Sequence, residues 1–494
     1  MSQAPLPQSG ITAHDYAIRE PEGCGVVGIY NHPDAARLAH LALYALQHRG
    51  QESAGIAAFD GTRVNVHKGQ GLVSEVFTPA SLDRLPGRNA VGHVRYSTTG
   101  SSSLCNAQPL QGNYRGGHIA VAHNGNLTNA DELALALEAN GAIFQSTTDS
   151  ELLIHLIAQN RSQDFIEALA ISLKRLRGAY SITMLRDKEL YAFKDPHGFR
   201  PLCLGKLGDD SWVVASESCA LDILGATYLR ELLPGEVVVF RNGTIEKLQL
   251  LEQIQPSSCV FELIYYSRPD STAAGSSIYT FRKRLGEELA REHPADAEIV
   301  IAIPDSSNAA AAGYAVASGI PLETGLVRSH YVGRTFIQPT QTMRDFGAKM
   351  KYNTVREVLR GKSVAVVDDS IVRGTTAKKI VRMLRDSGAR EIHFRVSAPP
   401  WKHPCFYGID TPDEEKLLAN NYDIPGIAKY LDADTIGFIS MEGLMRAMPK
   451  TMSYCTTCFT GVYVDGRPRR NTKLLNPLTE AETEPLVAGK GTRG

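Results

Sequence analysis

The sequence has 494 residues, which is longer than one ordinary domain and predicts about two or three. Hydrophobic residues make up 43% and charged residues 21%, the composition of a folded globular protein. The 52 basic and 53 acidic residues leave a net charge of −1, so the chain lacks the overall basic charge of a nucleic-acid-binding protein. No apolar stretch reaches the roughly 18 residues of a membrane span. Eight cysteines are too few for a disulfide scaffold, and we expect a cytoplasmic protein without nucleic-acid or membrane partners.

Both ends of the chain are polar. Residues 1–23 contain three prolines and lack the basic start and apolar segment of a signal peptide. On composition alone this segment reads as a disordered tail. Residues 476–494 are polar and rich in glycine, and we expect a flexible tail to which we assign no function.

Short apolar runs and Gly-rich turns follow residues 1–23. Cys24, between two glycines, precedes the apolar and β-branched run 26–30, which predicts a buried strand. The block lacks the regular strand–helix alternation that indicates a parallel sheet. We predict helices at 38–45, 152–158 and 165–176, and strands at 55–59, 90–94, 119–122, 180–185 and 212–215.

Five segments in this block occur in an order that is typical of one family. They are CGVVGI from Cys24, LQHRGQESAGI from Leu46, GHVRYST from Gly92, HNGNL from His123 and TDSE from Thr148. Together they resemble the glutaminase domain of the N-terminal-nucleophile amidotransferases. The resemblance implies an α+β sandwich of the αββα type over residues 24–257.

The same resemblance implies a role for each matching residue. Hydrolysis of the glutamine amide needs a nucleophile, a base, an oxyanion stabiliser and side chains that bind the α-carboxylate and α-ammonium groups of glutamine. The family uses the thiol of Cys24 as the nucleophile and its free α-amine as the base, so residues 1–23 would be a propeptide that is removed. Asn124 and the Gly125 N–H would form the oxyanion hole. Arg95 would hold the glutamine carboxylate and Asp149 its ammonium group, with Arg49 near the glutamine site.

The pattern changes after residue 258. Two continuous apolar runs, 299–303 and 363–367, each end in a polar loop and are followed by predicted helices at 308–318 and 377–387. A third strand is predicted at 391–396. Buried strands that alternate with helices predict a doubly wound parallel sheet, whose ligands bind at the carboxyl ends of the strands. Both polar loops lie at that edge.

The loop after the second run carries the sharpest chemical signal. Two adjacent carboxylates follow a buried strand, and a Gly/Thr turn then opens a helix, which suits a sugar phosphate and its metal. A helix N-cap with solvated acids would explain one aspartate but not the whole segment. The candidate residues are Asp368, Asp369, Ser370, Arg373, Gly374, Thr375 and Thr376.

This loop resembles the phosphoribosylpyrophosphate (PRPP) loop of the type I phosphoribosyltransferases, which implies an α/β domain over residues 258–475. Asp305, Ser306 and Ser307 then match the pyrophosphate loop of that family. The resemblance makes Ser306, Asp368 and Asp369 the residues associated with Mg²⁺. Residues 331–352, with several basic side chains, would form a hood over PRPP, or else a solvated basic loop.

Four cysteines lie in the second half. Cys455 and Cys458 form a CxxC pair, which alone suits zinc, a redox pair or an iron–sulfur site. Cys259 and Cys405 complete a Cys₄ set, which is compatible with zinc or a [4Fe–4S] cluster. Their contexts resemble the cluster-bearing branch of the glutamine PRPP amidotransferases, which implies a structural [4Fe–4S] cluster with zinc as the alternative. We predict that Cys203 and Cys219 are buried thiols and leave Cys105 unassigned.

The combined resemblance implies one reaction. PRPP, glutamine and water would give 5-phosphoribosylamine, glutamate and pyrophosphate, the first committed step of de novo purine biosynthesis, with ammonia passed internally between two sites. It also implies a homotetramer that purine nucleotides inhibit. Two alternatives stay open: a catalytically silent PRPP-sensing regulator, and a glutamine amidotransferase with another acceptor, such as one that makes glucosamine phosphate or asparagine.

Overall fold

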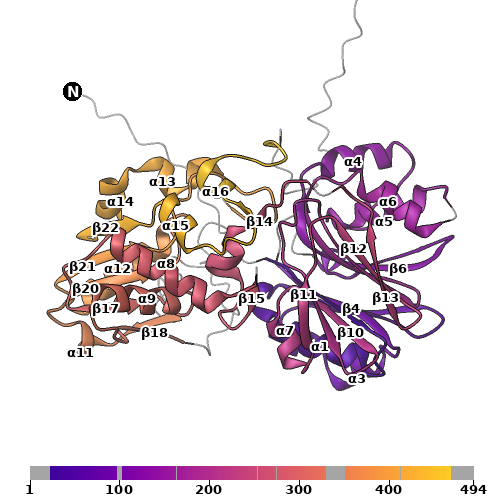
Figure 1. Cartoon of the computed structure of the whole chain (residues 1–494), viewed down its shortest axis with the longest axis horizontal. Helices are drawn as coiled ribbons and strands as arrows, with labels where there is room; N and C mark the ends of the chain where they lie inside the picture. The colour runs from indigo at the N-terminus through magenta and orange to yellow at the C-terminus, as the bar shows by residue number, and fades with distance from the viewer. Residues whose placement is uncertain are drawn as a thin grey trace, which may run out of the picture.

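The structure is a computed structural model of the whole chain. It describes residues 23–96, 103–162, 164–252, 254–273, 275–329, 351–411 and 413–468. Figure 1 shows two halves side by side, with the first half in indigo to magenta and the second in rose to yellow. The predicted propeptide up to residue 22, nearly all of the predicted hood and the predicted C-terminal tail lie outside the described residues.

The first half contains two antiparallel sheets. In spatial order, the seven-stranded sheet consists of β11 (Thr227–Glu231), β9 (Cys203–Leu207), β10 (Ser211–Ala215), β1 (Gly25–Tyr30), β4 (Asn89–Arg95), β2 (Ser53–Phe59) and β3 (Val64–Gln70). The six-stranded sheet consists of β13 (Thr244–Gln249), β12 (Glu236–Arg241), β8 (Glu189–Lys194), β7 (Gly178–Arg186), β6 (Gly117–Leu127) and β5 (Leu110–Tyr114).

Successive side chains along each strand point to opposite faces of the sheet, and this half is built in four layers. In β1, Val26 belongs to the apolar core between the two sheets, whereas Val27 and Ile29 belong to the core beneath the helices of the first sheet. A third core lies between the second sheet and its helices. The first sheet is covered by α1 (Ala35–Ala45), η2 (Gln47–Arg49), α2 (Val73–Val76), α3 (Pro79–Asp83) and α7 (Cys219–Ile223), and the second by α4 (Ala130–Glu138), α5 (Ser150–Gln159) and α6 (Phe165–Leu173). The arrangement is the predicted αββα sandwich.

The second half is built around a parallel sheet of four strands. Their order is β17 (Ile299–Ala302), β20 (Ser363–Asp368), β21 (Glu391–Val396) and β22 (Thr435–Phe438). One face packs against α8 (Ile278–Glu292), α9 (Asn308–Ser318) and α15 (Met441–Ala447), and the other against α11 (Arg356–Leu359), α12 (Thr375–Asp386) and α14 (Ile424–Leu431). Helices on both faces of a parallel sheet confirm the predicted doubly wound α/β fold.

Short elements complete the fold. They are η3 (Leu104–Asn106), β14 (Ser258–Cys259), η4 (Glu262–Tyr266), β15 (Thr272–Ala273), β16 (Ser276–Ser277), β18 (Leu326–Arg328), β19 (Tyr352–Thr354), η5 (Glu414–Lys416), α13 (Leu418–Asn421), β23 (Tyr454–Cys455) and α16 (Thr457–Thr460). β14 pairs in parallel with β23, so the start of the second half is tied to the end of its described part.

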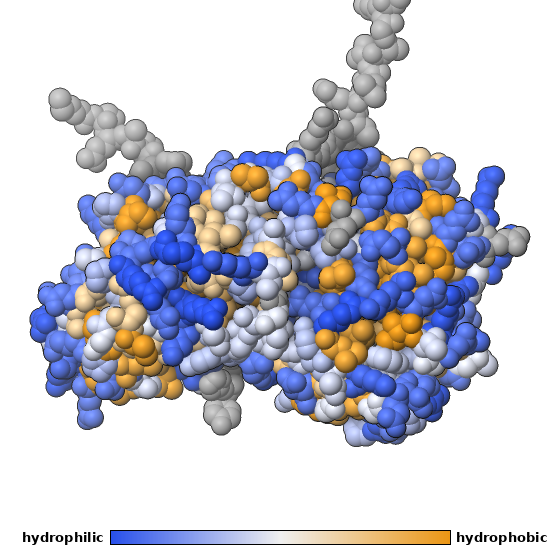
Figure 2. Space-filling model, viewed as in Figure 1, coloured by the Kyte–Doolittle hydropathy of each residue, from blue (hydrophilic) through white to orange (hydrophobic). Residues whose placement is uncertain are grey.

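Within the described part of the chain, no helix has both the length and the apolar character needed to cross a membrane. Figure 2 shows hydrophilic residues over both halves, with hydrophobic patches most extensive on the first half in this view. Large apolar side chains that are strongly exposed on the first half include Tyr44, Leu135 and Ile143.

Candidate active sites

Cys24 lies at the start of the central strand β1, which pairs with β4 and β10. Its side chain is buried, with 6% of its surface exposed, and its thiol donates to the Tyr96 carbonyl at 3.4 Å. Burial raises the pKa of the Cys24 thiol, although the Tyr96 hydrogen bond and the charges of Arg95 and Arg200 act in the opposite direction. A buried thiol of this kind needs a base before it becomes a nucleophile.

Asn124 and Gly125 lie on β6, in the other sheet. His93 Nε2, on β4, lies 3.0 Å from the carbonyl oxygen of His123, so the two sheets are joined next to Asn124. The Asn124 side chain is 1% exposed, and neither its nitrogen nor its oxygen has a hydrogen-bond partner among the described residues. Gly125 has φ +153°, and a Cβ there would lie 2.0 Å from the Ala179 carbonyl oxygen, so only glycine fits.

The two residues predicted to hold the ends of glutamine are buried in the same half. Arg95, the last residue of β4, donates from Nη1 to Glu52 Oε1 at 2.8 Å. Asp149, directly before α5, accepts from the Leu127 N–H at 2.8 Å. Burial alone would raise the pKa of Asp149, but the His123 ring and the hydrogen bonds lower it below its ordinary value, so the carboxylate is charged at neutral pH.

Arg49, which we predicted to lie near the glutamine site, contacts the backbone of Cys24. Its Nε donates to the Cys24 carbonyl oxygen at 2.9 Å, and its side chain is completely buried. Its Nη1 contacts Glu217 Oε1 at 2.6 Å, and its Nη2 contacts Glu262 Oε1, in the second half, at 2.7 Å. The guanidinium therefore connects the backbone of Cys24 to both halves.

Glu217, Glu262 and Arg200 belong to none of the predicted sites. Each is buried, and Arg200 Nη1 lies 3.1 Å from Glu262 Oε1. The sequence held one signal for Glu262, since it is the only charged residue in the apolar run 260–266. A charged residue in such a run is rarely buried unless it is paired, which points to a partner elsewhere in the chain. Arg200 lies in the stretch 195–202, which connects β8 to β9.

In the second half, the two predicted phosphate loops meet at the carboxyl edge of the sheet. They follow β17 and β20, which are neighbours in register. Ser306 Oγ donates to Asp369 Oδ2 at 2.5 Å, and Ser307 Oγ donates to Asp368 Oδ1 at 3.3 Å. Asp305 lies on the same loop, with its Oδ2 3.4 Å from Arg328 Nη1. The structure thus brings the three residues predicted to accompany Mg²⁺ together.

The remaining PRPP-loop residues lead into α12. Ser370 Oγ donates to Asp369 Oδ1 at 2.6 Å, and Gly374 has φ +74° at the N-cap of the helix, where Thr375 and Thr376 form the first turn. The backbone N–H groups of such a turn are available to a phosphate.

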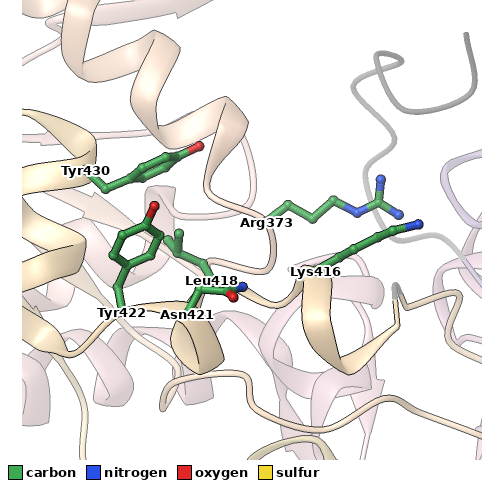
Figure 3. Close-up of a pocket in the computed structure, with 6 residues that line it drawn as sticks. All are labelled: Arg373, Lys416, Leu418, Asn421, Tyr422 and Tyr430. Atoms are coloured by element: carbon green, nitrogen blue, oxygen red, sulfur yellow. The ribbon is translucent and has the colours of Figure 1, made fainter. Parts of the chain in front are cut away.

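Arg373 directly precedes Gly374. It lines a cavity of about 390 Å³ with Lys416, Leu418, Asn421, Tyr422 and Tyr430. Figure 3 shows the Arg373 and Lys416 side chains extended side by side at one end of this cavity, with the two tyrosine rings at the other. Arg373 is exposed. Arg334, Arg344 and Lys349 of the predicted hood lie outside the described residues.

The four cysteines of the second half gather in one apolar core. Cys259 and Cys455 are paired in register between β14 and β23, and all four thiols are free. Burial raises the pKa of the Cys458 thiol, and Cys259, Cys455 and Cys405 raise it further. Within the described ranges, no group of three or more His, Cys, Asp or Glu side chains is arranged to hold a metal ion.

The other cysteines agree with the sequence analysis. Cys203 and Cys219 are buried, as predicted, and burial raises the pKa of both thiols. Cys105 is exposed in η3.

Comparison with known proteins decides the family. A family model described as a glutamine amidotransferase domain matches residues 93–222. The chain is 48% identical to amidophosphoribosyltransferase 1, chloroplastic, of Arabidopsis thaliana over 94% of this chain and 83% of the relative. It is 46% identical to the amidophosphoribosyltransferase of Bacillus subtilis over 90% and 94% of the two chains. The chain belongs to the amidophosphoribosyltransferase family.

A solved structure supports the same conclusion. The glutamine PRPP amidotransferase from B. subtilis, solved in complex with ADP and GMP, matches with a TM-score of 0.85 and 46% identity, over 89% of this chain and 97% of that one. The predicted fold class and the predicted enzyme of purine biosynthesis are therefore confirmed. These relatives do not favour the two alternatives, a PRPP-sensing regulator and an amidotransferase with another acceptor.

Proposed function

We propose that this amidophosphoribosyltransferase divides its reaction between the two sites described above. The first half would hydrolyse glutamine at Cys24, and the second would use the released ammonia to displace pyrophosphate from C1 of PRPP. The products are 5-phosphoribosylamine, glutamate and pyrophosphate. Internal passage of ammonia has a physical reason, because ammonia released into water at neutral pH is largely protonated and no longer nucleophilic.

The observation that carries the glutaminase assignment is the unpaired amide of Asn124. A buried polar group without a hydrogen-bond partner costs about 1–3 kcal/mol, so its persistence indicates a ligand that supplies the partner. The developing oxyanion of a tetrahedral intermediate would accept from the Asn124 side chain and the Gly125 N–H. Cys24 would attack the amide carbon, while Arg95 and Asp149 hold the carboxylate and ammonium of glutamine.

We also propose that residues 1–23 are a propeptide. Gly23, which precedes the nucleophile, is buried, and a Cβ on it would lie 2.8 Å from Arg200 Nη2. Removal of the segment would free the α-amine of Cys24, whose ordinary pKa of roughly 7.7–8.0 suits a base at neutral pH. N-terminal sequencing of active enzyme should begin at Cys24, and fully active protein with an intact Met1 would refute this part of the proposal.

Mg²⁺ would be held by Ser306, Asp368 and Asp369 together with the phosphates of PRPP. The donor set fits this ion, because two carboxylates and a hydroxyl supply the oxygen ligands that Mg²⁺ prefers. The ion would supply positive charge to the pyrophosphate leaving group. The chain's own contribution is to orient PRPP with the loop turn at Gly374 and with Ser370, Thr375 and Thr376.

The four cysteines would hold a [4Fe–4S] cluster, with zinc as the alternative. Four free thiols in one core make a donor set that suits a structural cluster, because soft thiolate ligands bind iron–sulfur centres. Iron and zinc analysis of anaerobically purified enzyme separates the two, and stoichiometric zinc without iron would overturn the cluster. A Cys458→Ser variant should lose the bound metal, whereas a Cys105→Ser control should retain it.

Regulation and assembly are further parts of the proposal. Purine nucleotides are proposed as inhibitors because the B. subtilis relative was solved with ADP and GMP. Exposed apolar side chains such as Ile143 support a homo-oligomer, which we propose to be a tetramer in the cytoplasm. The whole proposal is tested by release of pyrophosphate that depends on both glutamine and PRPP, and binding of both substrates without turnover would contradict it.

A further inference from the structure

Buried charges at the border between the two halves form a network beneath the nucleophile. Arg49 and Arg200 are fully buried, and Glu217 and Glu262 are 3% and 4% exposed. Arg49 donates from Nη1 to Glu262 Oε2 at 2.9 Å and from Nη2 to Glu262 Oε1 at 2.7 Å, a two-pronged pair. Removing charges from water is costly, so buried charges need partners of opposite sign. Arg200 Nη1 lies 3.1 Å from Glu262 Oε1 as an ion pair that does not form a hydrogen bond.

The first link of this network ends on the backbone of Cys24. The third donor of Arg49, Nε, bonds the Cys24 carbonyl oxygen at 2.9 Å. Because a guanidinium is planar and its donors keep a fixed geometry, the two bonds to Glu262 also set the direction of Nε. A side chain of the second half, together with Glu217 of the first half, therefore orients the group that holds the carbonyl of the nucleophilic residue.

A second link reaches the predicted oxyanion donors. Arg200, which pairs with Glu262, also donates from Nη2 to the Gly408 carbonyl oxygen at 2.8 Å. Gly408 has φ +97°, and a Cβ there would lie 3.0 Å from the Cα and carbonyl carbon of Gly125. The adjacent Asn126 donates from Nδ2 to the Phe406 carbonyl oxygen at 3.0 Å. The segment 406–408 thus packs directly on the backbone of Gly125.

Both links start next to cysteines of the Cys₄ set. Glu262 follows Cys259 by three residues, and Gly408 follows Cys405 by three. Cys259 is in turn paired in register with Cys455. The segments that support the glutaminase site are therefore the same segments that carry Cys259 and Cys405.

We propose that Glu262 is a positioning residue for glutamine hydrolysis: through Arg49 it fixes the backbone of Cys24, and through Arg200 and Gly408 it supports the oxyanion donor Gly125. The inference rests on the proposed roles of Cys24 and Gly125 and adds to them a requirement for the second half. Glu262 does not touch the reacting atoms. It acts by holding them within the small tolerance that nucleophilic attack requires.

The test separates glutamine-dependent synthesis from synthesis with added ammonia, which bypasses the first site. Glu262→Gln keeps the shape of the side chain but removes its charge, and Glu262→Asp keeps the charge but shortens the side chain. We expect Glu262→Gln to lower kcat with glutamine by about ten- to a hundredfold. KM for glutamine should change little, because Arg95 and Asp149 are untouched. Synthesis with ammonia should stay within about twofold, and Glu262→Asp should recover part of the loss.

A matched control substitution removes another contact between the two halves and leaves the side chains of Arg49, Arg200 and Glu262 unchanged. Asp465→Asn removes the charge pair that Asp465 forms with His197 at 2.8 Å. The backbone N–H of Asp465 donates to the Tyr407 hydroxyl at 3.2 Å, and the substitution keeps this backbone donor. The control should keep kcat with glutamine. A second readout is the rate of Cys24 alkylation as a function of pH, which should change in Glu262→Gln and not in the control.

Three outcomes would overturn the inference. The first is an unchanged kcat with glutamine in Glu262→Gln. The second is an equal loss of glutamine-dependent and ammonia-dependent synthesis in Glu262→Gln, together with a lower Tm. The third is a loss of kcat with glutamine in Asp465→Asn that equals the loss in Glu262→Gln. If Glu262→Gln does not fold, Glu262→Asp with unchanged Tm and unchanged kcat is equally decisive. The variant Cys24→Ala distinguishes failure of the proposed function from failure of this inference. Glutamine-dependent synthesis by that variant would refute the role of Cys24 itself.

Discussion

The Ser306 hydroxyl donates a hydrogen bond of 2.5 Å to Asp369 Oδ2 and so connects two polar loops that are 63 residues apart in the chain. The loops follow the neighbouring parallel strands β17 and β20. Asp369 also accepts from Ser370 Oγ at 2.6 Å, so two hydroxyls orient one carboxylate. A carboxylate with a fixed direction is prepared for an ion and for ribose hydroxyls before substrate arrives.

Replacement of Ser306 by alanine tests this relationship. A hydrogen bond to a charged group contributes about 1.5–3 kcal/mol, so we expect kcat/KM for PRPP to fall by roughly ten- to a hundredfold. Pyrophosphate release with added ammonia measures the effect without involving glutamine. Ser307→Ala is the matched control, because its bond to Asp368 is longer, at 3.3 Å, and its effect should be smaller. Equal losses in both variants would contradict the prediction.

Asn124→Ala should impair glutamine hydrolysis and spare synthesis with added ammonia. Loss of one oxyanion donor typically lowers kcat by about 10²–10³-fold, and we expect this loss in glutaminase turnover. Synthesis with ammonia should be preserved, because the second site is unchanged. Asn140→Ala, at an exposed position after α4, provides the same chemical change away from the site. A fall of both activities in Asn124→Ala would indicate a structural role instead.

The pH dependence of Cys24 alkylation follows from its burial. Burial raises the pKa of the thiol above its ordinary value of 9.0, so only a small fraction is thiolate at neutral pH. In the unprocessed chain, the rate of alkylation by iodoacetamide should rise about tenfold per pH unit through neutral pH and should level off only above about pH 9. Measurements on a Cys24→Ser variant give the background of the other thiols. A plateau near neutral pH would show that the charges of Arg95 and Arg200 outweigh burial.

The contact between His197 and Asp465 should make the border between the halves sensitive to pH. The pKa of His197 is raised above 6.5, since its hydrogen bonds to Asp465 and the Gln255 carbonyl outweigh burial, with Asp195 adding negative charge. Stabilisation by charged His197 is therefore complete below about pH 6.5 and is lost as pH rises through the higher folded-state pKa. Thermal unfolding of the wild type and Asp465→Asn should show a difference in Tm at about pH 6 that shrinks toward about pH 9. A constant difference would contradict the prediction.

Elements with a continuous apolar pattern could be predicted closely from sequence. The helix at 308–318 and the strand at 391–396 have the predicted bounds, because a buried run is followed by clear breaks. The strand predicted at 119–122 extends over 117–127, since the polar residues His123 to Asn126 continue its pairing with β7. Polar side chains that serve a site interrupt the apolar alternation on which strand prediction depends.

The support beneath the nucleophile could not be predicted in the same way. Arg49 and Glu262 are 213 residues apart, and the apolar run around Glu262 indicates that it has a partner without indicating which residue that is. Their pairing depends on how the two halves pack, which local periodicity does not encode. The motifs located Cys24 and the PRPP loop, whereas the residues that hold Cys24 in place emerged only from the fold.

The hydrogen bond from the Gly178 N–H to Asp465, like that from Asn126 to the Phe406 carbonyl, joins an early segment to a late one. During synthesis the ribosome makes Cys24 well before the segments around Phe406 and Asp465 that enclose its site. A nascent chain would thus carry its nucleophile without a finished site, and glutamine hydrolysis would begin only once the acceptor half has also been made.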